Sequence, residues 1–412
     1  MLKKNLLVVS ALASASAACL AQSSVTIYGI IDAGVSQVSG LRGGSIKQLN
    51  SGIMDGSRVG FRVNEDLGGG WRAIGTLEHR LELDTGTVSN RPPSGSQVPD
   101  RLAQAARLGL PAAFQPVVNA VSGNIGAGIG VNLGGGFWDR QAFVGLITPV
   151  GAVLAGRQYT PGYEVTATFD IMQTSSSLAA GQVASLPAAF DIRLSNSIQY
   201  RIQQGGFSAS AMVAAGEGST TTGRFTGVMA MYRGGAFAAG VGYNTRKNER
   251  DQKSLTNVVA GASVEFGPSK ISAMVASIKD DNPTGLSGIA AQVAPSVGAA
   301  NALFIQNAFI NGLRQDAQLA HIGYKLTLGA STFYAAFTQL DDKRAANADT
   351  RSFGVAYSYA LSKRTDISAV VTRFDNSGLG QAAPGGAGYL GGVTSTAGTD
   401  STSVAFGLRH RF

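Results

Sequence analysis

Cysteine, histidine and charge are all scarce in this sequence. Its 412 residues include 1 cysteine and 3 histidines, and charged residues make up only 14% of the chain. A single cysteine excludes a disulfide framework. The histidines show no metal-ligand spacing, and no Ser-His-acid pattern supports a hydrolase. We therefore predict no enzymatic activity, no metal site and no cofactor.

The first residues have the pattern of a secretory signal peptide. Lys3 and Lys4 precede a short apolar run, residues 6–12, and small residues follow up to Ala21, after which we expect cleavage. The apolar run is too short for the alternative, a transmembrane anchor. A lipoprotein signal would attach lipid to Cys19, but such signals usually carry leucine three residues earlier, where this chain has serine. We expect a signal peptide, residues 1–21, and one exported domain, residues 22–412.

Long hydrophobic runs are missing from the exported part. Hydrophobic residues form 44% of the chain, yet no stretch after residue 21 approaches the about 18 consecutive apolar residues of a membrane helix. Glycine, in contrast, contributes 55 residues. An exported chain of this kind belongs to one of two classes, a large soluble β-protein or an outer-membrane β-barrel.

The chain is basic, with a formal net charge of +8. No basic cluster with interleaved aromatic residues is present, so nucleic acid is not predicted as a partner. A basic balance instead predicts a potential that attracts small anions.

Hydrophobic side chains alternate with polar ones in many segments. In residues 24–35, Val25 and Ile27 alternate with Thr26 and Tyr28, and residues 57–64 and 351–361 repeat the pattern. Period two indicates strands with one apolar face. The opposite faces carry Arg, Asp, Ser, Thr and Gly, which suits lipid outside and water inside better than a soluble sandwich.

The connections between these segments fall into two kinds. Tight turns are predicted at EDLGGG, TPVG, QQGG, RGG and LSKR. Long loops are predicted at about 84–136, 160–191 and 281–315, the first with a possible helix beginning PDRLAQAARLG and capped by Asp100. Short turns at one end and long loops at the other are typical of an outer-membrane barrel.

Sixteen candidate strands make one all-β, antiparallel transmembrane barrel. They start near Ser24, Gly56, Trp71, Phe137, Ala152, Ile192, Gly206, Arg224, Ala236, Ser254, Lys270, Asp316, Gly329, Asp349, Arg364 and Thr399.

Several segments together resemble the Gram-negative general porins, in particular their β-proteobacterial branch. The similar segments are SVTIYGIIDAG, SRVGFRVNEDLGGGWRAIGTLEHRLELDTG, RQAFVGLITPVGAVLAGRQYTPGYE, LSNSIQY, YALSKRTD and the terminal FGLRHRF. The resemblance covers most of the exported domain. It implies a homotrimer of 16-stranded barrels in the outer membrane, with the third loop of each barrel, residues 160–191, folded into the pore. The second loop of the barrel, residues 84–136, is then a candidate for latching onto a neighbouring subunit, although its length could instead shield the pore mouth.

The resemblance also implies site residues. Arg58, Arg140 and Arg193 match a basic row on the barrel wall, and Arg157 could extend it. Alternation does not assign Arg140 to either face. The acidic candidates are Glu78, Glu164 and Asp170. On this interpretation the third loop has few acids, so the basic side dominates.

The last strand, residues 403–412, is expected to pair with the first strand and close the barrel. Phe406, Leu408 and Phe412 then resemble the family's C-terminal signal for the barrel assembly machinery. Closure removes the free edge, whose unpaired amides would be costly in lipid.

The expected function is a water-filled channel for passive diffusion of small hydrophilic solutes and ions, with weak to moderate anion selectivity. Outer-membrane lipid and lipopolysaccharide are the expected surroundings. Two alternatives remain: a channel selective for organic anions, and a structural or adhesive barrel whose lumen is plugged by residues 160–191 or 281–315.

Overall fold

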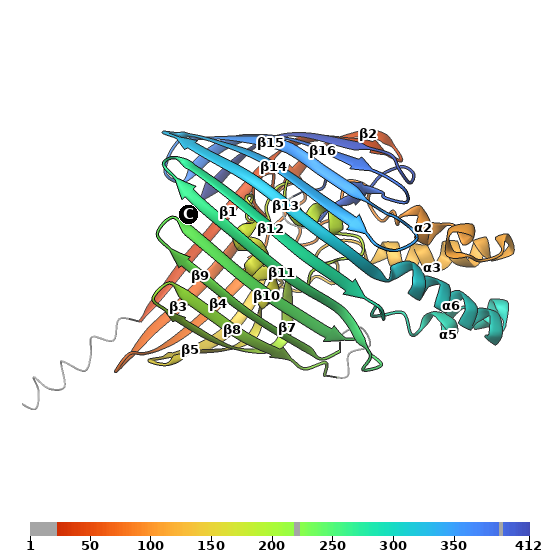
Figure 1. Ribbon diagram of the computed structural model, residues 1–412, viewed down its shortest axis with the longest axis horizontal. Helices are drawn as coiled ribbons and strands as arrows, with labels where there is room; N and C mark the ends of the chain where they lie inside the picture. Colours follow the sequence, from red (N-terminus) through yellow and green to blue (C-terminus); the bar gives the residue numbers. More distant parts are fainter. Residues whose placement is uncertain (1–22, 218–222, 387–389) are drawn as a thin grey trace, which may run out of the picture.

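The computed structural model describes residues 23–217, 223–386 and 390–412. The predicted signal peptide and Cys19 lie outside these residues. The model is a closed antiparallel barrel with long loops gathered at one end (Figure 1). No helix in the described part of the chain is long and apolar enough to cross a membrane.

Sixteen strands form the barrel wall, as predicted. They are β1 (Ser24–Leu41), β3 (Arg58–Gly68), β4 (Trp71–Arg80), β5 (Gln141–Thr148), β6 (Gly151–Tyr159), β7 (Arg193–Gln204), β8 (Phe207–Ala214), β9 (Phe225–Gly234), β10 (Phe237–Lys247), β11 (Lys253–Phe266), β12 (Ser269–Asp280), β13 (Gln315–Leu328), β14 (Ser331–Asp342), β15 (Thr350–Ala360), β16 (Thr365–Asn376) and β19 (Ser401–Arg411). The short strand β2 (Gly44–Ser51) pairs with β1 beyond the wall, and β17 (Ala382–Ala383) pairs with β18 (Gly392–Val393) in a separate ribbon.

The first and last strands close the barrel. β1 pairs with β19 from Ile30 opposite Arg411 to Val38 opposite Ser403, and its first half pairs with β3. Phe412 extends the closure, because its amide and carbonyl each bond to Gly29 at 3.1 Å. Phe406, Leu408 and Phe412 are 57%, 49% and 45% exposed. Their exposure does not test the role as an assembly signal, which stays a prediction.

The two ends of the barrel differ as the sequence indicates. All five predicted tight turns join neighbouring strands at the end where β1 starts and β19 finishes. The opposite end carries eight connections, which we number L1 to L8 in chain order. They include L2 (residues 81–140), L3 (160–192), L6 (281–314) and L8 (377–400). L8 is not among the predicted long loops.

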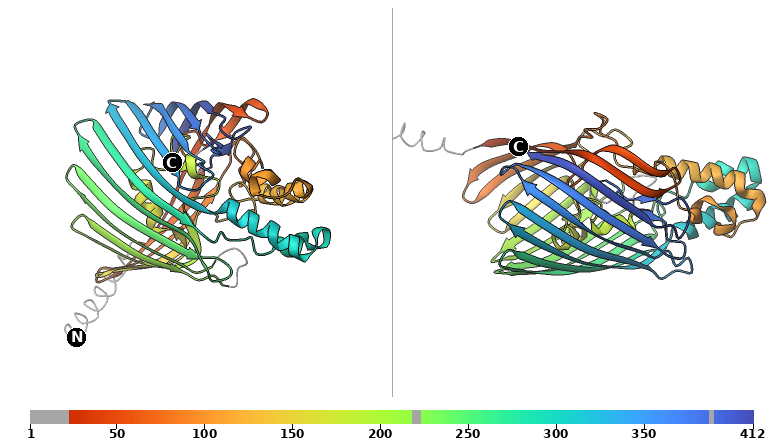
Figure 2. Two further views of the ribbon diagram at one scale, coloured as in Figure 1. Left: turned by 45° about the vertical axis from the view of Figure 1, so that its right-hand side comes forward. Right: turned by 90° about the horizontal axis from the view of Figure 1, so that it is seen from above.

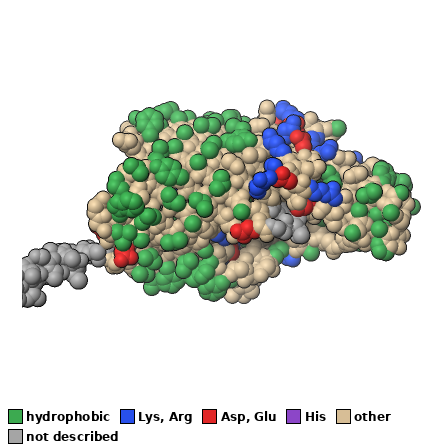
Figure 3. All heavy atoms as spheres, turned by 90° about the horizontal axis from the view of Figure 1, so that it is seen from below, with side chains coloured by type: hydrophobic (Ala, Val, Ile, Leu, Met, Phe, Trp, Pro, Cys, Tyr) green, Lys and Arg blue, Asp and Glu red, His purple; other side chains and the backbone are tan. Residues whose placement is uncertain are grey.

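The outer face of the wall is apolar. In β9 the side chains of Val228 and Tyr232 are exposed, while Met229 and Met231 between them are buried inside the barrel. The same alternation runs through β12 and β13. Figure 3 shows hydrophobic side chains spread over one flank of the barrel, with the charged side chains gathered toward the helix-bearing end. A lipid-facing band between polar rims is what a membrane barrel requires.

Part of the inner face is apolar as well, which the predicted polar interior did not anticipate. L3 folds into the barrel, with helix α4 (Pro161–Phe169) and the 3-10 helix η3 (Ala180–Ala184). Phe169 and Val183 of L3 pack with inward residues of β9 to β13, including Met274 and Leu319. Leu178 and its neighbours in L3 likewise pack with inward residues of β14, β15, β16 and β19. L3 therefore covers most of the inner wall from β10 to β19, and the open space lies along β3 to β9.

Glycines on the inner wall allow L3 to approach closely. A Cβ atom added at Gly261 of β11 would lie 2.5 Å from the ring of Phe169. One added at Gly323 of β13 would lie 2.2 Å from Cγ2 of Ile171, and one at Gly242 of β10 would lie 2.8 Å from Cα of Gly162. These distances are below any ordinary van der Waals contact, so the path of L3 depends on missing side chains in the wall.

Two of the predicted long loops form a helical bundle outside the barrel (Figure 2). L2 contributes α2 (Asp100–Ala103), η1 (Ala105–Leu108), η2 (Ala112–Phe114) and α3 (Gln115–Ala127), and L6 contributes α5 (Ile289–Val297) and α6 (Ala299–Leu313). Val118, Ile305 and Phe309 pack in its core. The predicted helix near PDRLAQAARLG is only α2 and η1, and Asp100 does not cap it, since Pro99 holds the N-cap position.

L2 folds onto its own subunit. The amide of Ala397 in L8 donates to Oδ2 of Asp100 at 3.1 Å, and Nη2 of Arg101 donates to the carbonyl of Leu186 in L3 at 3.0 Å. Gln97 also donates to the carbonyl of Thr394 in L8 at 2.7 Å. These contacts attach L2 to L3 and L8 of its own chain, and the two predicted roles of L2, shielding the pore mouth and latching onto a neighbour, both stay predictions.

Candidate functional site

A cavity of about 900 Å³ lies inside the barrel, between L3 and the wall strands from β3 to β9. Its lining reaches from Ile129 in L2 to Gly206 in the β7–β8 turn, near the opposite end of the barrel. Six arginines and two carboxylates stand among the described lining residues: Arg58, Arg80, Arg140, Arg193, Arg201, Arg233, Asp55 and Glu164. The passage is therefore strongly biased toward positive charge.

Three of the predicted residues, Arg58, Glu78 and Arg140, form one ion-pair cluster beside this cavity. Arg58 begins β3, Glu78 lies on the neighbouring β4, and Arg140 precedes β5, so antiparallel pairing brings them together. Nε of Arg140 lies 2.5 Å from Oε1 of Glu78, and Nε of Arg58 lies 3.6 Å from Oε2. Glu78 is only 4% exposed and also accepts a hydrogen bond from Tyr28. It lies behind the arginines as their counter-charge and does not line the cavity.

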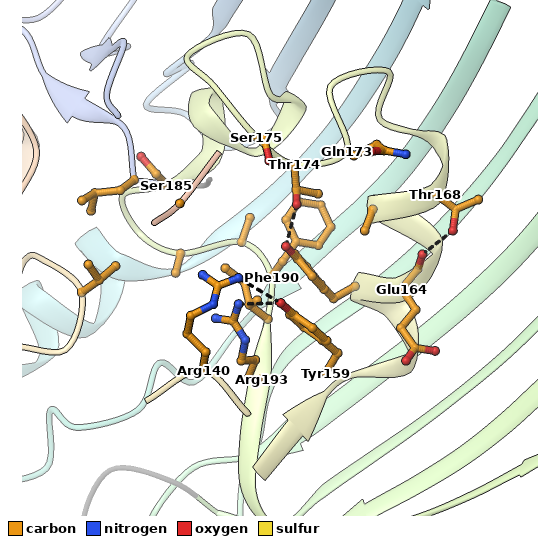
Figure 4. A pocket seen from close by; sticks show the side chains of 18 of the residues that line it. Arg140, Tyr159, Glu164, Thr168, Gln173, Thr174, Ser175, Ser185, Phe190 and Arg193 are labelled. Carbon is orange, nitrogen blue, oxygen red and sulfur yellow. Dashed lines mark hydrogen bonds between the residues drawn. The ribbon is translucent and has the colours of Figure 1, made fainter. Parts of the chain in front are cut away.

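A second cluster joins Arg140 to Arg193 through a tyrosine. Tyr159 ends β6, and its hydroxyl oxygen accepts hydrogen bonds from Nη2 of Arg193 at 2.7 Å and Nη2 of Arg140 at 3.4 Å. The ring of Tyr159 stacks on Tyr163 of L3 with centroids 5.1 Å apart. Figure 4 shows both guanidinium groups turned toward Tyr159. The tyrosine therefore holds two positive groups side by side at the cavity wall.

Glu164 is the predicted acid that lies on the cavity. It stands in the first turn of α4, whose N-cap residue is Thr160. Its carboxylate forms an ion pair with Arg201 of β7, and Arg233 of β9 donates to Oγ1 of Thr168 at 2.8 Å. L3 thus presents one carboxylate to a wall that carries further arginines.

Besides Glu78, the predicted residues Arg157 and Asp170 are not part of the cavity lining. Arg157 stands at an irregularity in the β6–β7 register, between Gly156 and Gln158. Its side chain bonds to the carbonyl of Asp139 at 2.7 Å and to Oγ of Ser195 at 3.1 Å. The structure therefore does not bring Arg157 into the row.

Asp170 is buried within L3, contrary to the prediction that it faces the pore. It is 1% exposed, and its carboxylate accepts hydrogen bonds from the amides of Met172, Thr174 and Ala180 at 2.9, 3.2 and 3.0 Å. Burial raises the pKa of Asp170. Its carboxylate shapes the turn after α4 and so holds L3 against the wall.

Arg80, Arg201 and Arg233 line the cavity but were missed in the sequence. For Arg201 and Arg233, the alternation of outward and inward side chains along the strand was the available signal. In β7 the exposed Tyr200 and Ile202 flank Arg201, and in β9 the exposed Tyr232 precedes Arg233. An arginine between two outward residues of one strand points inward.

The remaining lining is mixed. L3 contributes the apolar Phe190 and Ile192, and L2 contributes Ile129 and Val131. Further polar side chains of the lining are Asn90, Tyr163, Thr168, Gln173, Thr174, Ser175, Ser185, Gln203 and Ser208. In the described part of the chain, no cluster of three or more His, Cys, Asp or Glu side chains has the arrangement of a metal site.

Comparison with known proteins places this barrel in a family. The family model described as Gram-negative porin matches residues 8–379. The chain is a Gram-negative porin. It is an outer-membrane channel for passive diffusion, and the family consists of channels and not of enzymes.

Individual relatives agree with this assignment. The porin is 28% identical to outer membrane porin protein 32 of Delftia acidovorans over 436 residues, covering 100% of both chains. Among solved structures it is similar to an anion-selective porin from Comamonas acidovorans, with a TM-score of 0.67, 23% identity, and 95% and 100% of the two chains covered. It is also similar to the outer membrane protein OmpT of Vibrio cholerae in its trimer form, with a TM-score of 0.58, 12% identity, and 95% and 99% covered.

Proposed function

We propose that this porin prefers anions to a weak or moderate degree, and that its lining arginines create the preference. The observation that carries the proposal is the excess of arginines over carboxylates along one cavity, from Arg58 at the start of β3 to Arg233 near the β9–β10 turn. A unit charge about 4 Å from a passing ion is worth about 1 kcal/mol in bulk water and about 4 kcal/mol at an effective dielectric of 20. Several such contacts favour anions without trapping them.

Geometry supports a basic row that starts with Arg58, Arg140 and Arg193. Glu78 offsets part of the charge of the first two, while the partner of Arg193 is the neutral Tyr159. Glu164 is the acid that opposes the wall from L3. This unequal division leaves the passage positive, in line with the anion selectivity stated for the Comamonas acidovorans relative.

The direct test is conductance of the purified porin in planar bilayers. We expect open-channel steps, and in a KCl gradient a zero-current potential whose sign corresponds to chloride preference. A potential of the opposite sign would contradict the proposal. An absence of conductance would instead support a plugged structural barrel.

We infer that the porin forms a homotrimer, as the trimer form of the Vibrio cholerae relative supports. Conductance steps should then appear in groups of three, and single independent steps would count against it. The proposed surroundings are outer-membrane lipid and lipopolysaccharide, with the barrel assembly machinery as the folding partner.

Acidification is expected to strengthen the anion preference through Glu164. The side chain is only 22% exposed, and burial raises the pKa of Glu164, an effect that the ion pair with Arg201 only partly offsets. Glu164 therefore takes up its proton at a higher pH than an ordinary glutamate, whose pKa is about 4.3. Once it is neutral, the lining loses a negative charge and Arg201 is left unpaired. We expect the chloride-to-potassium permeability ratio to rise about two- to fivefold as the pH falls.

Glu164→Gln should show the raised ratio at neutral pH and lose the pH-dependent step. Glu265→Gln provides a matched control, because Glu265 is exposed at a short turn and does not line the cavity. If the E164Q channel kept the wild-type pH dependence, Glu164 would not be the titrating group.

A further inference from the structure

Arg140, Tyr159 and Arg193 form a cluster that can bind the charged group of a ligand. The two guanidinium groups share the hydroxyl oxygen of Tyr159, and both line the cavity. Nε of Arg193 is buried and has no hydrogen-bond partner among the described residues. Planar guanidinium groups with free N–H donors match the geometry of a carboxylate. The cluster therefore offers more than a diffuse positive potential.

An apolar surface lines the same cavity. From L3 it includes Ala189, Phe190 and Ile192, and from L2 it includes Ile129 and Val131. None of these side chains can bond to a hydrated inorganic anion. They can, however, remove the hydrocarbon part of an organic ion from water.

The apolar residues of L2 are held in place by hydrogen bonds to the backbone of L2. Asn90 and Val131 form a two-bond bridge, with N–O distances of 3.1 and 2.8 Å. Arg91 donates from Nη1 to the carbonyl of Ile129 and from Nη2 to that of Ala127, each at 3.1 Å. These bonds order the segment before any solute arrives, which lowers the entropic cost of binding.

We propose that this cavity binds organic anions that join one carboxylate to an apolar body, such as an aromatic or medium-chain carboxylate. The carboxylate bonds to Arg140 and Arg193, and the apolar body rests on Phe190, Ile192 and Val131. The proposal rests on the proposed anion preference and adds the ligand class. Such a site raises the local concentration of these solutes and slows chloride while it is occupied.

The test measures block of the chloride current in planar bilayers at constant KCl and neutral pH. The probes are acetate, hexanoate, benzoate, the hydrophilic dicarboxylate succinate, and the neutral benzyl alcohol. We expect half-maximal block by hexanoate and benzoate at concentrations about tenfold below that of acetate, because each buried methylene adds to affinity. Succinate and benzyl alcohol should block no better than acetate.

Two variants separate the parts of the site. The double variant Val131→Thr, Ile192→Thr keeps side-chain shape at Val131 and approximates it at Ile192 while adding hydroxyl groups, and should remove most of the preference for benzoate over acetate. Tyr159→Phe removes the shared acceptor of the two guanidinium groups, so it should weaken block by acetate and by benzoate by similar factors. Leu303→Thr, at a 55% exposed position on the helical bundle, is the matched control and should behave as wild type.

Each result has a defined consequence. Equal block by benzoate, hexanoate and acetate, or block by succinate as strong as that by benzoate, would overturn the proposed ligand class. If chloride preference is present in those same membranes, the anion-selective function stands and only the site is lost. A wild-type channel without any anion preference would defeat both.

Discussion

Replacing Arg58 and Arg193 with serine is expected to shift the porin's selectivity toward cations, with the chloride-to-potassium permeability ratio falling by about tenfold. Arg58 is paired with Asp55 at 2.8 Å and with Glu78 at 3.6 Å, so its removal takes away a positive charge and leaves each of these carboxylates with one cationic partner fewer. Arg193 is bonded to the neutral Tyr159, so its removal subtracts a positive charge with no compensating change. Both effects have the same sign.

The measurement is the zero-current potential of R58S/R193S in a KCl gradient, compared with wild type. Arg224→Ser is the control, because Arg224 is exposed in a loop where it pairs with Asp251. At ionic strengths near 0.1 M the Debye length of about 10 Å limits the influence of such a distant charge. An unchanged potential in R58S/R193S would show that these two arginines are only solvated lumen residues.

Filling the glycine positions beneath L3 should have the second large effect. In the double variant Gly261→Leu, Gly323→Leu, the new side chains would occupy the space of Phe169 and Ile171. The wall strands are held by continuous ladders on both sides, so the loop has to move. We expect L3 to shift toward the arginine wall and single-channel conductance to fall. Overpacking of this kind costs about 1–3 kcal/mol at each site, so thermal stability should fall as well.

Gly75→Leu is the matched control for that variant. Gly75 lies on the outer face of β4, opposite Val63, and a Cβ there would meet no atom closer than 3.6 Å. It tests the cost of losing a strand glycine without disturbing L3. The milder Gly261→Ala keeps the experiment informative if the double variant fails to assemble. Wild-type conductance and stability in both inner-wall variants would mean that these glycines do not determine the path of L3.

The arrangement of L3 also explains why the interior differs from a simple water-filled tube. Its apolar side chains cover most of the inner wall from β10 to β19, and Asp170 bonds to amides of the loop itself. Only Glu164 of the two predicted loop acids reaches the cavity. The fold therefore leaves fewer carboxylates of this loop facing the pore than the sequence contains. This favours the basic side of the pore.

The barrel could be predicted from the sequence because its causes are local. Each strand must present an apolar face to lipid, so alternation such as that of Val25 and Ile27 repeats along the chain. Tight turns have their own local signature in glycine pairs, and the pairing of the last strand with the first follows from the need to remove free edges. Arg58 and Arg193 are assigned to the wall by their resemblance to porin segments, and for Arg58 the alternation with Val59 and Phe61 also indicates the polar face.

The rest was decided by contacts between distant segments. Whether an inward side chain meets water or protein depends on the loop that folds over it, so Arg233 lines the cavity while Met274 is buried under L3. The same reason separates Glu164 from Asp170. The bundle of L2 and L6 arises because two uncharged segments, residues 108–138 and 282–313, bury their apolar faces against each other. Period two assigns a side chain to a face of the sheet, and only tertiary packing determines what that face contacts.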